Sequence, residues 1–186
     1  DWMTGSTGPN PSLDRDDRVI YVGSFSKVLF PALRLGYLVV PPALREPLRA
    51  TKWLCDRGCP AIEQHALATL VASGRFERLL RRSGRILAAR RQALLDGLAR
   101  HAAGLVEIEG TSAGMHVAAW LPGHRASDVP VVIAAAEAVG VGVHPVAPYF
   151  SRPPRRAGLL LGYAGLAARD LAEAARRLGG VLRQTA

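Results

Sequence analysis

The stretch that decides the fold is Tyr21-Val-Gly-Ser-Phe-Ser-Lys-Val-Leu-Phe-Pro-Ala-Leu-Arg-Leu-Gly-Tyr37. It joins two apolar runs, residues 18–22 and 35–40, through a short polar loop. The runs are rich in β-branched residues and end at glycine or proline, which predicts two buried strands. Pro31 prevents one continuous helix between them. The pattern therefore indicates an α/β sheet with this loop at one of its edges.

The loop between the two strands carries the donors of an anion site. Ser24 and Ser26 supply hydroxyl groups, Lys27 follows directly, and Arg34 lies seven residues beyond the lysine. The planar guanidinium of an arginine can donate two parallel hydrogen bonds to a phosphate, and Gly23 allows the backbone to come close to a ligand. A lysine amine in such a place is a candidate nucleophile toward an aldehyde. These residues alone are compatible with any phosphate site, and equally with a polar surface turn.

Residues 23–37 resemble the lysine segment of fold-type I pyridoxal-phosphate enzymes, the aspartate-aminotransferase-like family of class I and II aminotransferases. More narrowly, they are similar to the aminotransferase-like domain of MocR-type GntR transcriptional regulators, which also carry an N-terminal winged helix-turn-helix. The resemblance covers about residues 17–184, and supporting stretches are 60–64, 74–82, 89–94, 114–116 and 159–164. It implies the C-terminal portion of the α/β fold of aspartate aminotransferases. Residues 1–75 would end the large cofactor domain and residues 76–186 would form the small domain.

The resemblance also assigns roles to the loop. Lys27 is the catalytic residue and forms the Schiff base with the aldehyde of pyridoxal 5′-phosphate, while Ser24, Ser26 and Arg34 contact the cofactor phosphate. In a transaminase the same lysine would move a proton between the substrate α-carbon and the cofactor. The implied ligand is a small-molecule amine or amino acid. The full-length protein is expected to be a homodimer that contacts DNA only through a separate winged-helix domain, which this chain lacks.

Two departures from the family pattern leave the activity open. Many aminotransferases have an arginine for the substrate carboxylate where this sequence has Leu160, and Arg155 and Arg156 are the nearby alternatives. In the family, the aspartate that pairs with the pyridine nitrogen precedes the lysine. Only 26 residues precede Lys27 here, and the aspartates at 14, 16 and 17 are not expected to take that role. Three interpretations follow: the sensor domain of a regulator, an amino-acid aminotransferase, or a truncated fragment without activity of its own.

Composition bears on partners and compartment. The formal charge is +9 and the sequence pI is about 10.7. Such an excess of positive charge would suit binding to nucleic acid. The explanation we favour for this charge is a solvated arginine face on the helix at 76–102. Cys55 and Cys59 cannot supply the four ligands of a structural zinc site, so free thiols and no metal are expected. No apolar run approaches the roughly 20 residues that span a bilayer, and no signal-peptide pattern occurs. We therefore expect a soluble cytoplasmic protein without membrane contact.

Apolar patterns, together with the glycines and prolines that end them, predict the remaining elements. Ser127 is expected to cap the fourth helix, and Trp53 and Trp120 are expected in a core or a dimer interface. If residues 1–75 hold only part of a sheet, an unpaired edge and exposed apolar faces should result. The predicted helices are 42–56, 61–73, 76–102, 127–139 and 169–182, and the further strands are 105–109, 114–121, 141–144 and 158–163.

Overall fold

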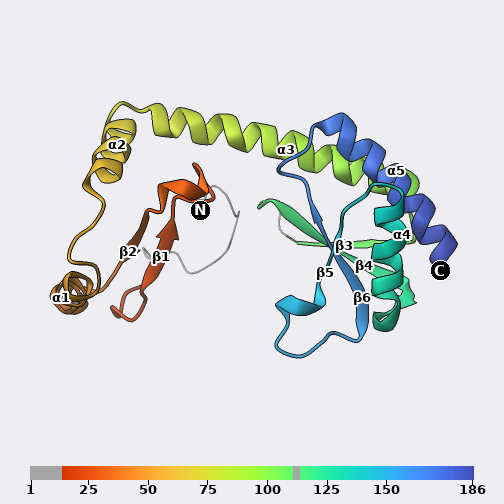
Figure 1. The fold of residues 1–186 in the computed structure, drawn as a ribbon, viewed down its shortest axis with the longest axis horizontal. Coiled ribbons are helices and arrows are strands. Elements are labelled where there is room, and N and C mark those ends of the chain that lie inside the picture. Colours follow the sequence, from red (N-terminus) through yellow and green to blue (C-terminus); the bar gives the residue numbers. More distant parts are fainter. Residues whose placement is uncertain (1–13, 111–113) are drawn as a thin grey trace. The chain divides into compact units, whose positions relative to one another are not determined.

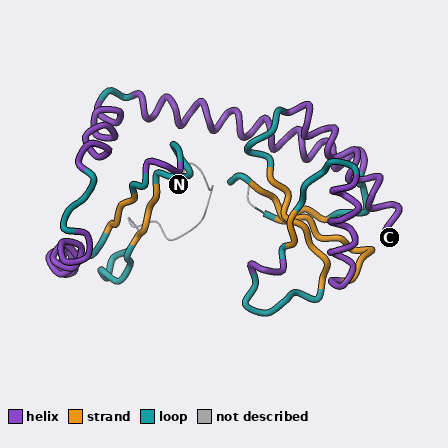
Figure 2. The backbone as a smooth tube through the Cα atoms, in the orientation of Figure 1, coloured by secondary structure: helices purple, strands orange, loops and turns teal. Residues whose placement is uncertain are grey.

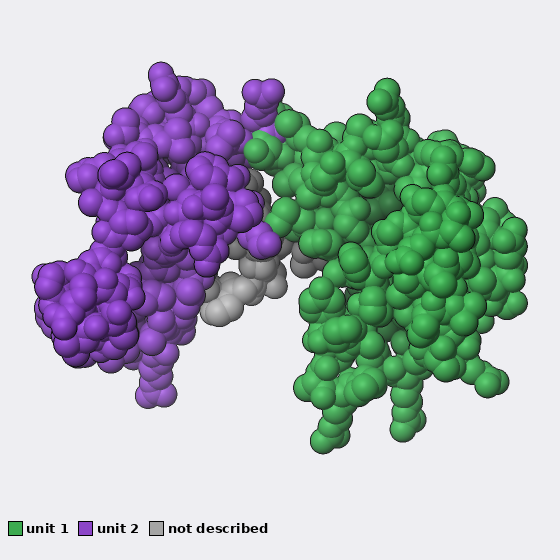
Figure 3. All heavy atoms as spheres, viewed as in Figure 1, with its two compact units in different colours: residues 1–5, 83–186 green, residues 6–82 purple. Residues whose placement is uncertain are grey.

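The computed structural model describes residues 14–110 and 114–186, which fall into two compact units. The first unit along the chain ends at Arg82 (purple, keyed as unit 2 in Figure 3), and the second begins at Ser83 (green, keyed as unit 1). The division lies inside the long helix α3 (Arg75–His101). The boundary predicted between residues 75 and 76 falls at the start of the same helix. It concerns the large and small domains of the family fold and stays a prediction.

The first unit begins with a two-stranded antiparallel ribbon, β1 (Tyr21–Ser24) and β2 (Gly36–Val39). Ser24 pairs with Gly36, so the connecting loop, which contains the short 3₁₀ turn η2 (Pro31–Leu33), closes at this end. A Cβ on Gly23 would lie 2.3 Å from the ring of Tyr37. Only glycine therefore allows the tyrosine ring to lie against the backbone of β1.

These strands are present, as the sequence predicts, but they are not buried. Val22 is 72% exposed and its partner Leu38 is 52% exposed. The prediction took apolar composition as a sign of burial, whereas this sheet has two strands within the described residues and no layer covers these side chains. The expected exposed apolar faces are therefore observed in this unit.

Helices follow the ribbon in the first unit: after the turn η3 (Pro42–Leu44) come α1 (Arg45–Asp56), α2 (Ala61–Ala72) and the start of α3. Helix α1 ends at Arg57, whose backbone is left-handed (φ 57°) and whose N–H donates to the carbonyl oxygen of Trp53 at 2.9 Å. Trp53 is 59% exposed and so belongs to no core within this unit. Cys55 and Cys59 are exposed free thiols, as predicted.

The second unit is a four-stranded antiparallel sheet covered by helices, and Figures 1 and 2 show α4 and α5 beside the strands. The strand order is β3-β4-β6-β5. No helix in the described ranges is long and apolar enough to cross a bilayer. The elements are β3 (Glu107–Glu109), β4 (His116–Arg125), η4 (Ala126–Asp128), α4 (Val129–Ala138), β5 (His144–Pro145), η5 (Ala147–Tyr149), β6 (Arg156–Gly162) and α5 (Ala168–Thr185).

The core of this unit follows from the alternation of side chains along the two central strands. Val117 pairs with Leu161 and Ala119 with Leu159, so all four side chains point to one face. That face packs against the helices, because the same buried cluster contains residues of α3, α4 and α5. The largest fully buried side chains are Tyr163, Leu98, Leu121, Leu159, Leu171, Leu182, Val117 and Val132.

Helices α3 and α5 approach closely at two glycines. A Cβ on Gly97 would lie 2.7 Å from the Cβ of Ala175, and a Cβ on Gly179 would lie 2.2 Å from the carbonyl oxygen of His101. Real Cβ atoms do not come this near to other atoms. The pairing of the two helices therefore depends on glycine at these positions.

The predicted helix cap at Ser127 is wrong. Ser127 lies in η4, one residue before the cap position of α4, which Asp128 occupies. Asp128 does not cap α4 with its side chain; instead its Oδ2 accepts the backbone N–H of Arg125 at 2.7 Å. This hydrogen bond lowers the pKa of Asp128, since it stabilises the ionised form.

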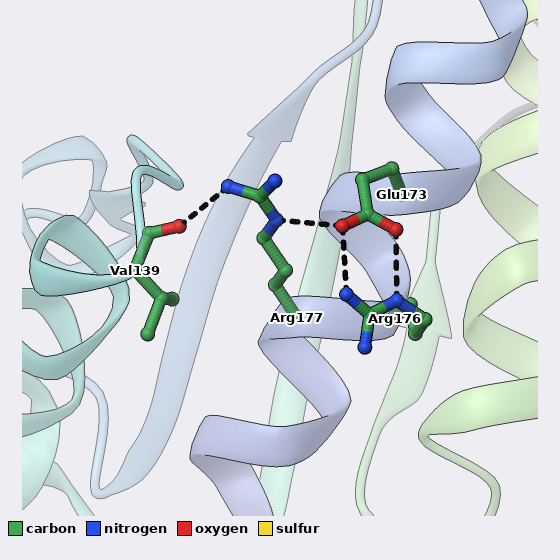
Figure 4. A network of polar contacts seen from close by, with 4 residues as sticks. All are labelled: Val139, Glu173, Arg176 and Arg177. Carbon is green, nitrogen blue, oxygen red and sulfur yellow. Dashed lines mark hydrogen bonds and ion pairs between the residues drawn. The ribbon is translucent and has the colours of Figure 1, made fainter.

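A polar network on α5 links that helix to the end of α4 (Figure 4). Glu173 accepts hydrogen bonds from the Nε atoms of Arg176 and Arg177, both at 2.8 Å, and from Nη2 of Arg176 at 2.7 Å. The Nη1 atom of Arg177 donates to the carbonyl oxygen of Val139 at 2.9 Å. Hydrogen bonds from the two guanidinium groups lower the pKa of Glu173 from 4.5 to about 2, and the bond from Arg176 has the larger effect.

The Glu173 network predicts how the stability of this unit changes at low pH. Because the folded-state pKa of Glu173 lies below its unfolded value, its ionised form stabilises the fold above pH 4.5, and that contribution is lost as pH falls toward about 2. Carbon-13 NMR of the side-chain carboxyl should give a titration midpoint near 2. The Glu173→Gln variant should lose less stability than the parent across the same range. A carboxyl that titrates near 4.5 would show that the network does not hold in solution.

Candidate functional site

The antiparallel register gathers all four predicted site residues in one loop. Ser24 ends β1 opposite Gly36, and beyond this pair the backbone N–H of Phe25 donates to the carbonyl oxygen of Leu35 at 3.0 Å. Ser26 and Lys27 therefore leave one strand close to where Arg34 enters the other. The sequence brings these residues together through a single turn of chain, so their proximity needs no long-range contact.

A tight turn presents Lys27 directly after β1. The Oγ atom of Ser24 accepts the backbone N–H of Ser26 at 3.2 Å, and the N–H of Leu29 donates to the carbonyl oxygen of Phe25 at 2.8 Å. The side chain of Lys27 is exposed at this turn. The amine is therefore accessible to a molecule that approaches the end of the ribbon.

Arg34 is held at the other end of the loop by unusual backbone geometry. It follows η2 with a left-handed conformation (φ 51°), and its N–H donates to the carbonyl oxygen of Pro31 at 3.4 Å. A non-glycine residue rarely adopts this conformation. The next residue, Leu35, is only 8% exposed, so its burial anchors the end of the loop and leaves the Arg34 side chain exposed.

The charges of this loop are not neutralised by acidic side chains. Within residues 14–110 and 114–186, neither Lys27 nor Arg34 takes part in an ion pair. Lys52, the other lysine of the sequence, is instead paired with Asp56, and the hydrogen bond to that carboxylate raises the pKa of Lys52. Two serine hydroxyls and two cations without a carboxylate partner suit a phosphorylated aldehyde, because phosphate needs the donors and the aldehyde needs an amine.

An aromatic group at the base of the loop was not predicted from the sequence. The Tyr37 ring lies against Gly23, with ring centroids 5.9 Å from Tyr21 and 5.4 Å from Phe25. Phe25 in turn meets Phe76 of α3 at 6.0 Å. Burial raises the pKa of Tyr37. From the sequence, this aromatic group could have been found only through the pairing of Gly23 with Tyr37, and that pairing can be predicted only when the strand register is known.

Asp14 is occupied by the chain that leads into β1. Its Oδ2 accepts the backbone N–H of Val19 at 2.8 Å and its Oδ1 accepts that of Asp16 at 3.2 Å. The bond from Val19 is the main reason that the pKa of Asp14 is lowered. A carboxylate committed to this turn is consistent with the expectation that Asp14 is not the ring-nitrogen partner.

The arginines considered for a substrate carboxylate belong to the second unit. Arg156 forms an ion pair with Glu107, and its guanidinium carbon lies 5.0 Å from the centre of the Trp120 ring. Trp120 is 7% exposed, which confirms its predicted place in a core. Arg156 is thus engaged with Glu107 of β3, whereas Arg155 is exposed and Leu160 is a partly buried residue of β6.

Comparison with known proteins places this geometry in a family context. The model of the family "Aminotransferase class I and II" matches residues 3–178. The chain is 35% identical over 161 residues to "Probable rhizopine catabolism regulatory protein MocR" of Rhizobium meliloti, covering 87% of this chain and 32% of that protein. It is 33% identical over 165 residues to the 2-aminoadipate transaminase of Thermus thermophilus, covering 89% and 41%.

A solved structure agrees with the fold. The α-aminoadipate aminotransferase LysN of Thermus thermophilus, complexed with N-(5′-phosphopyridoxyl)-L-leucine, matches with a TM-score of 0.80 and 30% identity. The match covers 99% of this chain and 48% of that one. The chain therefore spans about a third of the length of its first curated relatives and about half of the length of this structure.

Proposed function

The chain belongs to the class I and II aminotransferase family, and from that premise we propose that it is the pyridoxal-phosphate-binding, ligand-sensing part of a MocR/GntR-type transcriptional regulator. The observation that carries the proposal is the loop of Ser24, Ser26, Lys27 and Arg34. It brings an accessible amine, two hydroxyls and an arginine to one end of the ribbon, and within the described residues no carboxylate pairs with its two cations.

In this proposal each side chain has a separate task. The hydroxyls of Ser24 and Ser26 and the guanidinium of Arg34 would hold the phosphate of bound pyridoxal phosphate. The amine of Lys27 would be the group that condenses with its aldehyde, with loss of the aldehyde oxygen as water. Pyridoxal phosphate, when bound, supplies that aldehyde and a ring that withdraws electrons. The aromatic group of Tyr21, Tyr37 and Phe25 keeps the base of the loop rigid, so the donors are arranged before the cofactor arrives.

Sensing is favoured over transamination by two observations. The first relatives are a regulatory protein and HTH-type transcriptional regulators. The apolar Leu160 stands where the family resemblance leads one to expect an arginine, and Arg156 is already paired with Glu107. We further propose a cytoplasmic homodimer that binds a small amine or amino acid and carries its DNA-reading domain separately.

The second candidate is an amino-acid aminotransferase, which the similarity to the 2-aminoadipate transaminase favours. The two functions differ in turnover. A sensor should change its cofactor spectrum when an amine binds but should not convert a 2-oxo acid catalytically. Chromatographic detection of a new amino acid, formed in many-fold excess over protein, would establish the enzyme instead.

The Arg34→Gln variant tests the phosphate contact. Hydrogen bonds to charged groups contribute about 1.5–3 kcal/mol, so the variant should bind pyridoxal phosphate roughly ten- to hundredfold more weakly. Pyridoxal, which lacks the phosphate, should bind the variant and the parent protein alike. Absorbance titrations of the full-length gene product with both compounds measure the two affinities.

Arg45→Gln is the matched control, because Arg45 is exposed and lies outside the loop. This variant should bind both compounds as the parent protein does. Equal weakening for pyridoxal and its phosphate in Arg34→Gln would mean that Arg34 maintains the loop rather than contacting the phosphate. No binding of pyridoxal phosphate to the full-length gene product at all would refute the proposed function.

A further inference from the structure

A stripe of three arginines lies on one side of the start of helix α3. Arg75, Arg78 and Arg82, here called the arginine stripe, are three and four residues apart, so they align on one face over about 10 Å of helix. All three are exposed. Among the described residues, none of the three forms an ion pair or a side-chain hydrogen bond.

Several other exposed arginines on the helices are paired, although Arg45, Arg85 and Arg100 form no ion pair within the described residues. Arg49 lies 3.4 Å from Glu46, and Arg177 shares Glu173 with its neighbour Arg176. Within the first turns of α3, the carboxylate of Glu77 is already bound to Arg81 at 3.3 Å. The arginine stripe is therefore a linear array of positive charge with no counter-charge of its own in the described chain.

This arrangement is unfavourable for the helix by itself. Arg75 and Arg78 lie in the first turn, where the helix dipole favours anions and disfavours cations. Like charges three or four residues apart also repel one another on a helix. An extended anion laid along the stripe would remove both penalties, so the energetics point to a partner rather than to a role in folding.

We propose that the arginine stripe binds the phosphate backbone of double-stranded DNA. A row of guanidinium groups fits a row of phosphates, since each guanidinium can donate two parallel hydrogen bonds to one phosphate. The stripe contains no aromatic side chain on which unpaired bases could stack, which disfavours single strands. The inference rests on the proposed regulatory function and departs from the sequence-based expectation that DNA is contacted only through a separate winged-helix domain. It adds contacts without sequence preference to those of that domain.

The test is the salt dependence of binding to a fluorescent duplex of random sequence. Binding of the 186-residue chain is measured by anisotropy between 50 and 200 mM salt and compared with that of Arg75→Gln/Arg78→Gln/Arg82→Gln. Three lost phosphate contacts should reduce the steepness of log affinity against log salt by about 2.7. Between the lowest and highest salt, the affinity of the parent chain should therefore fall roughly 40-fold more than that of the variant. Melting of the variant, followed by circular dichroism, should occur no lower than that of the parent chain.

The control triple variant is Arg45→Gln/Arg152→Gln/Arg155→Gln, which removes the same charge from exposed positions elsewhere. It should leave the slope nearly unchanged, and an equal loss in both triple variants would overturn the proposal in favour of diffuse attraction. Tighter, stripe-dependent binding to polyglutamate or to phosphatidylserine vesicles would also overturn it. Cofactor binding should be unchanged in the stripe variant, so failure here is distinguishable from failure of the proposed function.

Discussion

Replacing Lys27 with alanine is expected to abolish the visible absorbance that pyridoxal phosphate acquires when it binds the full-length gene product. The amine of Lys27 is the one group of the loop able to bond to an aldehyde carbon, because serine hydroxyls and a guanidinium do not form a stable C=N link. The loss should be complete. Reduction with borohydride followed by peptide mass spectrometry should place the attached cofactor on Lys27 in the parent protein and nowhere in the variant.

Lys52→Ala is the matched control, since the chain has only these two lysines. Lys52 is exposed on α1 and paired with Asp56, so its removal should leave the absorbance unchanged. If both variants lose the band, the effect arises from altered folding. If Lys27→Ala keeps the band, the cofactor is attached elsewhere and the assignment of Lys27 is wrong.

The loop could be predicted because its residues are near one another in the sequence. From Ser24 to Arg34 the chain needs only a turn and a strand pairing to bring the four side chains to one end of the ribbon. The helices were predicted for a related reason: α1 and α3 follow a local apolar period, and α1, α2 and α3 are each followed within three residues by a glycine or another residue with left-handed backbone. Local patterns determine such elements to within a few residues.

Burial in the ribbon could not be predicted in the same way. The apolar character of Val22 and Leu38 shows that they could be buried, but burial also requires a covering layer, which a local pattern does not reveal. The strand predicted at 141–144 is likewise found only at β5 (His144–Pro145), so the prediction overlaps it at His144 alone, although Val141 and Val143 are buried. Packing and strand pairing are separate interactions: these valines are packed in the core but do not pair with a neighbouring strand.

The polar contacts of the second unit could not be predicted, because they join residues that are far apart in the sequence. Arg156 pairs with Glu107 across 49 positions of sequence and lies over Trp120. The sequence suggested Arg156 only as a free carboxylate-binding group, because nothing local indicates that an acid on another strand will meet it. The sheet register determines this pair, and register is fixed by the whole core rather than by the pattern of one strand.

Replacing Gly179 with alanine is expected to cause the largest loss of stability in the second unit. The new Cβ would lie 2.2 Å from the carbonyl oxygen of His101, which is backbone and cannot rotate away. Overpacking of this kind costs about 1–3 kcal/mol or more. For a unit of this size, a loss of about 2 kcal/mol lowers the melting temperature by roughly 10 °C, which circular dichroism can measure.

Gly180→Ala is the neighbouring control on the same helix. No atom lies within 4 Å of a Cβ built on Gly180, and alanine is the better helix former by about 1 kcal/mol, so this variant should melt a few degrees higher than the parent. The two substitutions make the same chemical change one residue apart, and only the contact with His101 separates them. If both variants gain stability, α3 and α5 do not approach closely in solution, and the close contact at Gly97 would need to be tested in the same way.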